Sequence, residues 1–348
     1  MLGRVWERLR RKLGGATRYP APVVADPDVV PRLQSALAEF YDGSERRFRR
    51  LFLDGKPIPA RTHEQPWLDL CADAGLVEKR SLGIYVPRVL VFPLHGAMIA
   101  TDLLSHGDAD QVFSLMLEQL YLVATMDVRH GDRVLELCVG SGVNSLFAAE
   151  VAAAVTGVDL SPRALEFARF NAALNPGCVP VELKQGSLFE PLAAGERYDL
   201  ILVNPPFEPV PPGAGHFLHS HGGEDGLDVV RTILAEAPGR LAAGGRFEMF
   251  TWSPGDDDGV LVADLLRAAF PGRRLEIHRV DSRPLDDRIA QFSGAKDFAA
   301  WRDRLAAAGY TRVWGVFTRV CGAGPADTEF VERPETLAEC RAILAEWT

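Results

Sequence analysis

Hydrophobic and polar residues follow two different patterns along the chain. Between residues 29 and 76, apolar side chains recur every three or four positions, which is typical of short helices with one buried face. Residues 83–92 are rich in β-branched and aromatic side chains and predict a strand, in which Pro87 favours the edge of a sheet. We expect residues 95–104 to pair with this strand. The first pattern therefore predicts a small α+β module, similar to a winged helix.

From about residue 112 onward, apolar runs typical of buried strands alternate with helical patterns. We expect strands at 133–139, 155–159, 179–184, 198–203, 246–252, 275–280 and 311–320, and helices at 145–155, 161–174, 227–235, 260–270 and 298–308. Ser161 is a candidate helix cap, with Pro162 in the first turn. This alternation predicts a doubly wound, mostly parallel sheet, which binds ligands at the carboxyl ends of its strands.

The two patterns and the chain ends suggest four regions. We expect a basic N-terminal helix at residues 1–19, an accessory or substrate domain at 20–108 and the main domain at 109–320. Residues 321–348 are expected to form an acidic tail with one helix from Glu335 to Trp347.

Composition narrows the class of protein. Of the 348 residues, 47% are hydrophobic and 24% are charged, which excludes collagen-like and disordered chains. We find no uncharged apolar run long enough to span a membrane and no apolar signal-peptide core. The five cysteines are dispersed without a CxxC pair, so we expect reduced thiols, no structural metal knuckle and a cytoplasmic protein.

Charge is unevenly distributed. The net charge is −9, yet the first 61 residues are basic overall and the remainder is strongly acidic. A globally acidic protein is a poor candidate for nucleic-acid binding. The basic clusters Arg8–Lys12 and Arg46–Arg50 leave RNA contact open as an alternative, although a solvated helix face is the favoured interpretation.

The segment Glu136-Leu-Cys-Val-Gly-Ser-Gly142 follows a predicted strand and begins a helix. Glycines at this position allow the backbone to approach a ligand closely. Asp159 ends the next strand, where a carboxylate can accept hydrogen bonds from ribose hydroxyls. Together these residues indicate an adenosine-containing cofactor, with NAD as one alternative. Glu136 argues against NAD, because a carboxylate beside the loop suits an amino group and would repel a pyrophosphate.

The tetrapeptide Asn204-Pro205-Pro206-Phe207 follows the fourth strand. Its prolines stiffen the backbone, so Asn204 can accept hydrogen bonds from an NH2 group and aim the nitrogen lone pair at an electrophile. Phe207 offers a ring against which a planar group or an activated methyl can pack. This is the most specific signal in the chain.

On these motifs, residues 133–320 resemble the class I S-adenosylmethionine-dependent methyltransferases with an (N/D)PP(Y/F) motif. These include the HemK-type protein-glutamine N5-methyltransferases and the ribosomal RNA guanine-N2 methyltransferases. The resemblance implies a Rossmann-like seven-stranded sheet and S-adenosylmethionine as cofactor. It implies catalytic roles for the Asn204–Phe207 tetrapeptide, and cofactor contacts from Glu136, Cys138, Gly140, Gly142, Asp159, Leu160, Ser187, Leu188 and Asn204.

The sequence departs from the family pattern at three informative positions. Cys138 stands where the motif has its first glycine, and Ser187 replaces an adenine-contacting aspartate. Glu208 follows the tetrapeptide where the RNA enzymes have histidine. We therefore expect methyl transfer to an amino or amide nitrogen of a small molecule or peptide, with RNA base methylation as the second interpretation. A non-catalytic cofactor-binding protein and an NAD oxidoreductase are the remaining alternatives.

The loop after the tetrapeptide contains three histidines, His216, His219 and His221. They are candidates for a base or substrate contact at the rim of the pocket. A metal site is a second interpretation, although no known ligand spacing supports it, and a solvated hinge loop is the third.

Overall fold

A computed structural model describes residues 19–23, 29–215, 217–323 and 327–348. The predicted basic helix at residues 1–19 lies almost entirely outside the described residues. His216 is also outside them. Within them, the helical elements are α2 (Val30–Phe48), η2 (Arg49–Leu53), α3 (Gln65–Asp73), η3 (Ser81–Gly83), α4 (Leu117–Thr125), α5 (Val143–Ala148), α6 (Pro162–Leu174), α7 (Asp228–Arg240), α8 (Leu261–Ala269), α9 (Leu285–Ile289), η4 (Ala290–Phe292), α10 (Phe298–Ala307) and α11 (Pro334–Trp347).

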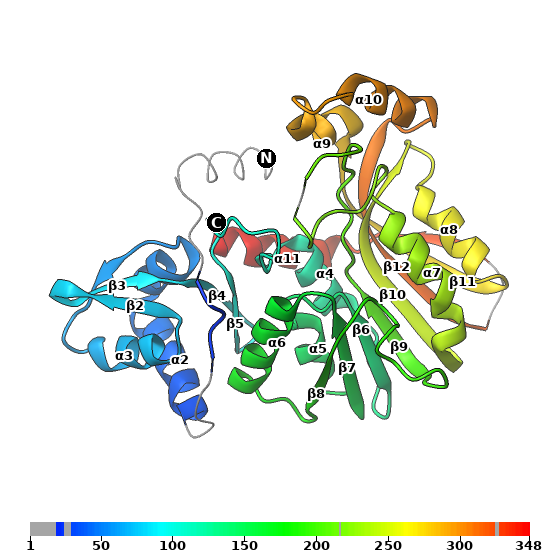
Figure 1. Ribbon diagram of the computed structural model, residues 1–348. Helices are drawn as coiled ribbons and strands as arrows, with labels where there is room; N and C mark the ends of the chain where they lie inside the picture. Colours follow the sequence, from blue (N-terminus) through cyan, green and yellow to red (C-terminus); the bar gives the residue numbers. More distant parts are fainter. Residues whose placement is uncertain (1–18, 24–28, 216, 324–326) are drawn as a thin grey trace.

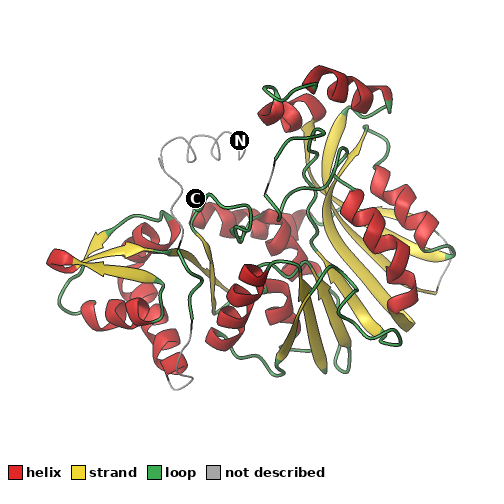
Figure 2. Ribbon diagram, in the orientation of Figure 1, coloured by secondary structure: helices red, strands yellow, loops and turns green. Residues whose placement is uncertain are grey.

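The strands are β1 (Ile58–Pro59), β2 (Val77–Arg80), β3 (Ile84–Pro87), β4 (Val89–Leu94), β5 (Ala97–Asp102), β6 (Arg133–Leu137), β7 (Ala154–Asp159), β8 (Val181–Gln185), β9 (Tyr198–Val203), β10 (Leu241–Gly255), β11 (Arg273–Pro284), β12 (Arg312–Ala323) and β13 (Thr328–Val331). Figures 1 and 2 show their arrangement around one large twisted sheet.

The central sheet has the strand order β13-β11-β12-β10-β9-β6-β7-β8. Neighbours from β10 to β8 are parallel, whereas β12 runs antiparallel to both β10 and β11. The predicted mostly parallel, doubly wound sheet is therefore confirmed. Each of the seven strands predicted after residue 112 is present.

Two hydrophobic cores lie on opposite faces of this sheet. Helices α4, α5, α6 and α11 cover one face, and α7 and α8 cover the other (Figure 1). Helix α6 begins at a capping residue: the Ser161 hydroxyl accepts a hydrogen bond from the Ala164 amide at 3.2 Å, as its predicted capping role requires. No helix in the described part of the chain combines the length and apolar character needed to cross a membrane.

The region expected to be an acidic tail is integrated into the fold. Its residues 328–331 form β13, which pairs in parallel with β11 as an eighth strand. Cys340, Leu344 and Trp347 of α11 are buried in the core beside α4. The helix of the tail was predicted, but the strand before it and the packing of both were not.

Residues 30–102 form a small module of helices and antiparallel strands beside the main sheet (Figure 1). The single strand expected at 83–92 is divided at Arg88 into β3 and β4, which belong to different sheets. β3 is the middle strand of the order β1-β3-β2, but β1 pairs only with the first two residues of β3, so Pro87 is paired on the β2 side alone, which agrees with its predicted edge position. The hairpin expected from residues 95–104 is present as β4 and β5.

Two asparagines of α6 attach the β4–β5 hairpin to the main domain. Asn175 accepts from the Met98 amide at 2.8 Å and donates to the Met98 carbonyl at 2.9 Å. Asn171 makes the same pair of bonds to Ala100, at 2.8 and 2.9 Å. The side chains thus replace a neighbouring strand along one edge of β5, because buried backbone groups need partners.

Candidate active site

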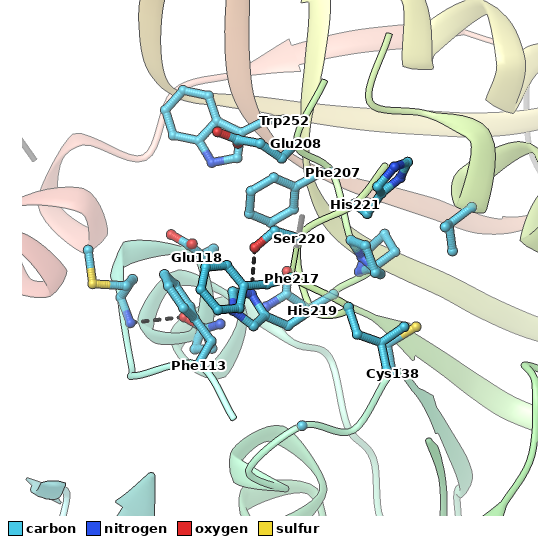
Figure 3. Close-up of a pocket in the computed structure, with 18 of the residues that line it drawn as sticks. Phe113, Glu118, Cys138, Phe207, Glu208, Phe217, His219, Ser220, His221 and Trp252 are labelled. Atoms are coloured by element: carbon cyan, nitrogen blue, oxygen red, sulfur yellow. Dashed lines mark hydrogen bonds between the residues drawn. The ribbon is translucent and has the colours of Figure 1, made fainter. Parts of the chain in front are cut away.

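A cavity of about 1330 Å³ opens at the carboxyl ends of β6, β7 and β9. Its size exceeds the usual range of about 300–1,000 Å³ for a single small-molecule pocket, so it has room for a cofactor and a second molecule. Residues from α4, β10 and the α9–η4 segment complete its wall. Figure 3 shows the Phe207 ring directed into the cavity, with Glu118 to one side and Cys138 toward the other.

The loop after β6 forms one wall and has an unusual backbone. Cys138, Gly140 and Gly142 all have positive φ angles, of 61°, 55° and 79°. Cys138 thus adopts the left-handed conformation that glycine adopts most easily. Cys138 and Gly140 line the cavity, whereas Gly142 does not. A Cβ at Gly142 would lie only 3.0 Å from the Ala168 Cβ, so this glycine allows close packing of the loop on α6.

Glu136 differs from the prediction. Its side chain is fully buried and does not line the cavity. The carboxylate accepts hydrogen bonds from the Asn144 amide group at 2.8 Å, the Ser145 backbone amide at 2.7 Å and the Ser145 hydroxyl. Burial raises its pKa to about 7, and these hydrogen bonds only partly offset that effect. Glu136 therefore stabilises the start of α5, and its contact with a cofactor amino group stays a prediction.

Asp159 lines the cavity at the end of β7. Its carboxylate accepts from the Gly140 amide at 2.9 Å and from the Ser161 amide at 2.8 Å. Burial raises the pKa of this group, and the backbone hydrogen bonds counteract the rise. These bonds fix the carboxylate beside the glycine loop and leave lone pairs that can accept hydroxyl donors. Leu160, Ser187 and Leu188 line the same part of the cavity.

Asn204, Pro205, Pro206 and Phe207 all line the cavity directly after β9. The Oδ1 atom of Asn204 is buried and accepts no hydrogen bond from the residues that the structure describes. Such an atom is unfavourable unless a donor reaches it, at a cost of about 1–3 kcal/mol. Asn204 thus presents an acceptor to whatever binds in the cavity.

The loop after the tetrapeptide closes one side of the cavity. Glu208 is nearly buried and accepts hydrogen bonds from Arg288 and Gln291, which ties the loop to α9 and η4. The Arg288 guanidinium also lies 4.7 Å from the centre of the Trp252 ring. The departure from the RNA-enzyme pattern at Glu208 therefore has a structural role in shaping the cavity.

The described histidines of this loop lie at the cavity wall. His219 stacks between Phe113 and Phe217, with ring centres 4.8 and 5.2 Å away. His221 is exposed and its Nδ1 accepts a long bond, 3.4 Å, from the Gly223 amide. Both residues line the cavity. They come from one wall and do not form a metal-binding group with each other among the described residues.

Sequence reasoning missed several residues of the cavity. Glu118 is only 8% exposed, lines the cavity and forms no ion pair with any described residue. Burial raises the pKa of its carboxyl group, while the charges of Arg288 and Arg283 act in the opposite direction. Trp252 was identified only as a strand residue. The sequence carried one signal for Glu118, because it is the lone acidic residue in the apolar run from Val112 to Leu122.

The basic cluster at the end of α2 is largely engaged within the protein. Arg47 donates to Glu64 at 2.6 Å and Arg50 donates to the Pro57 carbonyl at 3.3 Å. Arg49 donates to the Glu346 carbonyl. These bonds hold the N-terminal module together and attach it to α11, and the charge of Arg47 is paired with that of Glu64.

Comparisons with known proteins agree with this geometry. A family model described as the methyltransferase small domain matches residues 102–255. The ribosomal protein uL3 glutamine methyltransferase of Bordetella pertussis is 38% identical over 156 residues, which are 40% of this chain and 47% of that protein. The release factor glutamine methyltransferase of Xylella fastidiosa is 32% identical over 213 residues, which are 56% of this chain and 72% of that protein.

Among solved structures, a 16S rRNA N2 methyltransferase of Thermus thermophilus in complex with AdoMet and guanosine aligns with a TM-score of 0.39 and 20% identity, over 61% of this chain and 58% of that chain. The chain spans about half the length of the first curated relatives that it matches. The Xylella protein is matched over most of its length. The chain therefore belongs to the class I S-adenosylmethionine-dependent methyltransferases with a methyltransferase small domain.

Proposed function

We propose that this chain methylates an amide or amine nitrogen of a peptide or small molecule, with S-adenosylmethionine as the methyl donor. The observation that supports this most strongly is the buried, unpartnered Oδ1 of Asn204 in the wall of a cavity that also contains the glycine loop and Asp159. An acceptor oxygen at this position suits a substrate that brings an N–H donor. Related glutamine methyltransferases act on such a nitrogen, as their names state.

The residues of the cavity fit S-adenosylmethionine. Asp159 can accept ribose hydroxyls, and Leu160 and Leu188 offer apolar surface beside it. Gly140 leaves open space on the side of its missing Cβ, so a ligand can approach the loop closely. Ser187 offers a hydroxyl where the family usually has aspartate. When bound, the cofactor supplies an electrophilic methyl group.

The chain's own residues then have three tasks. Asn204 accepts a hydrogen bond from the substrate nitrogen and so orients its lone pair, while Pro205 and Pro206 keep the amide in place. Phe207 excludes water and packs against the planar group that is methylated. Glu118 faces the same cavity and can accept a proton or hydrogen bond from the substrate nitrogen, because burial raises the pKa of its carboxyl group.

A peptide or small-molecule substrate accounts for the structure better than RNA. The cavity wall includes several carboxyl groups, among them Glu118, Asp281 and Asp287. Acidic walls oppose a phosphate backbone. In the basic cluster at the end of α2, the charge of Arg47 is already paired with that of Glu64.

The test is transfer of a labelled methyl group from S-adenosylmethionine to an extract separated into protein, small-molecule and RNA fractions. We expect label in the protein or small-molecule fraction. Asn204→Ala should reduce transfer by about 100-fold, similar to removal of other transition-state hydrogen bonds, without lowering the melting temperature. Label confined to RNA would contradict the proposed substrate. Undiminished transfer by a folded Asn204→Ala protein would contradict the role of Asn204.

A further inference from the structure

We propose that His106, Asp108 and Asp110 form a binding site for a divalent transition-metal cation of the Zn²⁺ type. They belong to the segment His106-Gly-Asp-Ala-Asp110, which follows β5 and precedes α4. The His106 Nε2 lies 3.7 Å from Asp108 Oδ2 and 3.9 Å from Asp110 Oδ1. One donor atom from each of the three side chains lies within 4.8 Å of the others.

The burial of His106 distinguishes this group from an ordinary acidic loop. The side chain is only 4% exposed, and neither ring nitrogen forms a hydrogen bond with the described residues. Burying two unsatisfied ring nitrogens is unfavourable. A cation bound at Nε2, between the two carboxylates, would remove part of that cost.

The donor set suits a borderline divalent cation. One imidazole nitrogen and two carboxylate oxygens are typical Zn²⁺ donors, with bonds of about 2.0–2.2 Å, and they leave a fourth position for water. Two carboxylates and a neutral histidine also balance a charge of +2. Tetrahedral donors lie about 3.4 Å apart at such bond lengths, and the half-exposed Asp110 side chain is free to rotate toward that spacing.

The surroundings of His106 resemble the outer shell of a metal site. Asp102 Oδ1 lies 3.8 Å from Nδ1, on the opposite side of the ring from Asp108 and Asp110. Arg163 binds both oxygens of Asp102, and the Val112 amide donates to Oδ2 at 2.8 Å. A carboxylate behind a ligating histidine commonly orients the ring through a hydrogen bond, and at 3.8 Å Asp102 would form one only after a small movement of the His106 ring.

The position of the site couples it to the cavity. Between the two aspartates, the Ala109 carbonyl accepts a hydrogen bond from the Leu218 amide at 2.8 Å. Leu218 and Asp110 both line the cavity. A cation on this segment would therefore stabilise the anchor of the 217–221 loop without contacting Asn204. The sequence predicts no metal knuckle, and His106 becomes a candidate ligand only because folding buries it.

The test is calorimetric titration of Zn²⁺ into chelator-treated protein, with Co²⁺ absorption as a second readout of coordination. Every protein carries Cys178→Ser, because the exposed thiol would bind these ions itself. We expect one equivalent to bind. Asp108→Asn combined with Asp110→Asn should weaken binding by at least about tenfold, and so should His106→Asn.

Two controls distinguish this site from other histidines. His130→Asn changes an exposed histidine and should leave affinity unchanged. Combined His219→Asn and His221→Asn should also leave it unchanged. The side chains of Asp108 and Asp110 are partly exposed, so we expect the aspartate variants to fold. They therefore test the site even if His106→Asn fails to fold. The proposal is overturned if the parent protein binds no ion, if both aspartate replacements leave affinity unchanged, or if only the His219 and His221 replacements abolish binding.

Discussion

The carboxyl group of Glu136 couples protonation to stability, because burial raises its pKa from an ordinary 4.5 to about 7. Between these two pH values the folded protein holds a proton that the unfolded chain releases. The contribution of Glu136 to the free energy of unfolding is therefore complete below about pH 4.5 and is lost as the pH rises through 7. It amounts to roughly 3 kcal/mol.

Glu136→Gln should remove this contribution to the pH dependence. We expect the free energy of unfolding to fall less steeply between pH 5 and about pH 8 in the variant than in the parent, when both are measured by urea denaturation. Glu150→Gln, at an exposed position, is the matched control and should keep the parent slope. Equal slopes in the parent and Glu136→Gln proteins would contradict the assignment.

Among single residues, the sequence predicted the site residues whose position in the fold follows from their place at the end of a strand. Asp159 ends β7 and Asn204 directly follows β9, so their side chains meet at one edge of the sheet. Glu136 lies inside β6, and the direction of its side chain depends on the packing of α5, which sequence periodicity does not specify. The same limit applies to Glu118.

At the scale of elements, α6 and the β4–β5 hairpin depend on Asn171. Its amide group pairs with both backbone groups of Ala100 and also donates to the Ser141 carbonyl at 2.9 Å. Asn171→Ala leaves these buried groups without partners and should lower the free energy of unfolding by about 3 kcal/mol, measured by urea denaturation. Arg169→Ala, on the exposed face of α6, should change it by less than about 0.5 kcal/mol. Similar values for the two variants would contradict this role.

Strands and helices with strong local periodicity were predictable, and those defined by distant partners were not. β13 has only four residues and exists because β11 offers a free edge. The division at Arg88 arises because β3 pairs with β1 and β2, whereas β4 pairs with β5. Neither partner choice is encoded in the local pattern.

At the scale of the whole molecule, Trp347 connects α11 to the β4–β5 hairpin. Its ring centre lies 4.9 Å from that of Phe92, and the side chain is only 6% exposed. Trp347→Ala should lower the free energy of unfolding by about 3 kcal/mol, because it leaves a cavity in this core. Glu339→Ala, on the exposed side of the same helix, is the control and should have little effect in the same denaturation experiment. An equally small effect of Trp347→Ala would show that α11 does not stabilise the fold.

The cavity itself is a property of the whole chain. The glycine loop, Asp159 and the tetrapeptide were predicted as one cofactor site because all lie at strand ends. The wall formed by α4, β10 and α9 was not predicted, because α4 lies more than 100 positions before β10 and α9 and meets them only after the sheet is complete.

We infer that this cavity holds S-adenosylmethionine between Asp159 and Asn204. The direct measurement is calorimetric titration of S-adenosylhomocysteine into the purified protein, which requires no knowledge of the methyl acceptor. We predict one equivalent bound, binding at least about tenfold weaker in Asp159→Ala, and no comparable binding of NAD. Absence of S-adenosylhomocysteine binding, or equal affinity in a folded Asp159→Ala protein, would contradict this cofactor site.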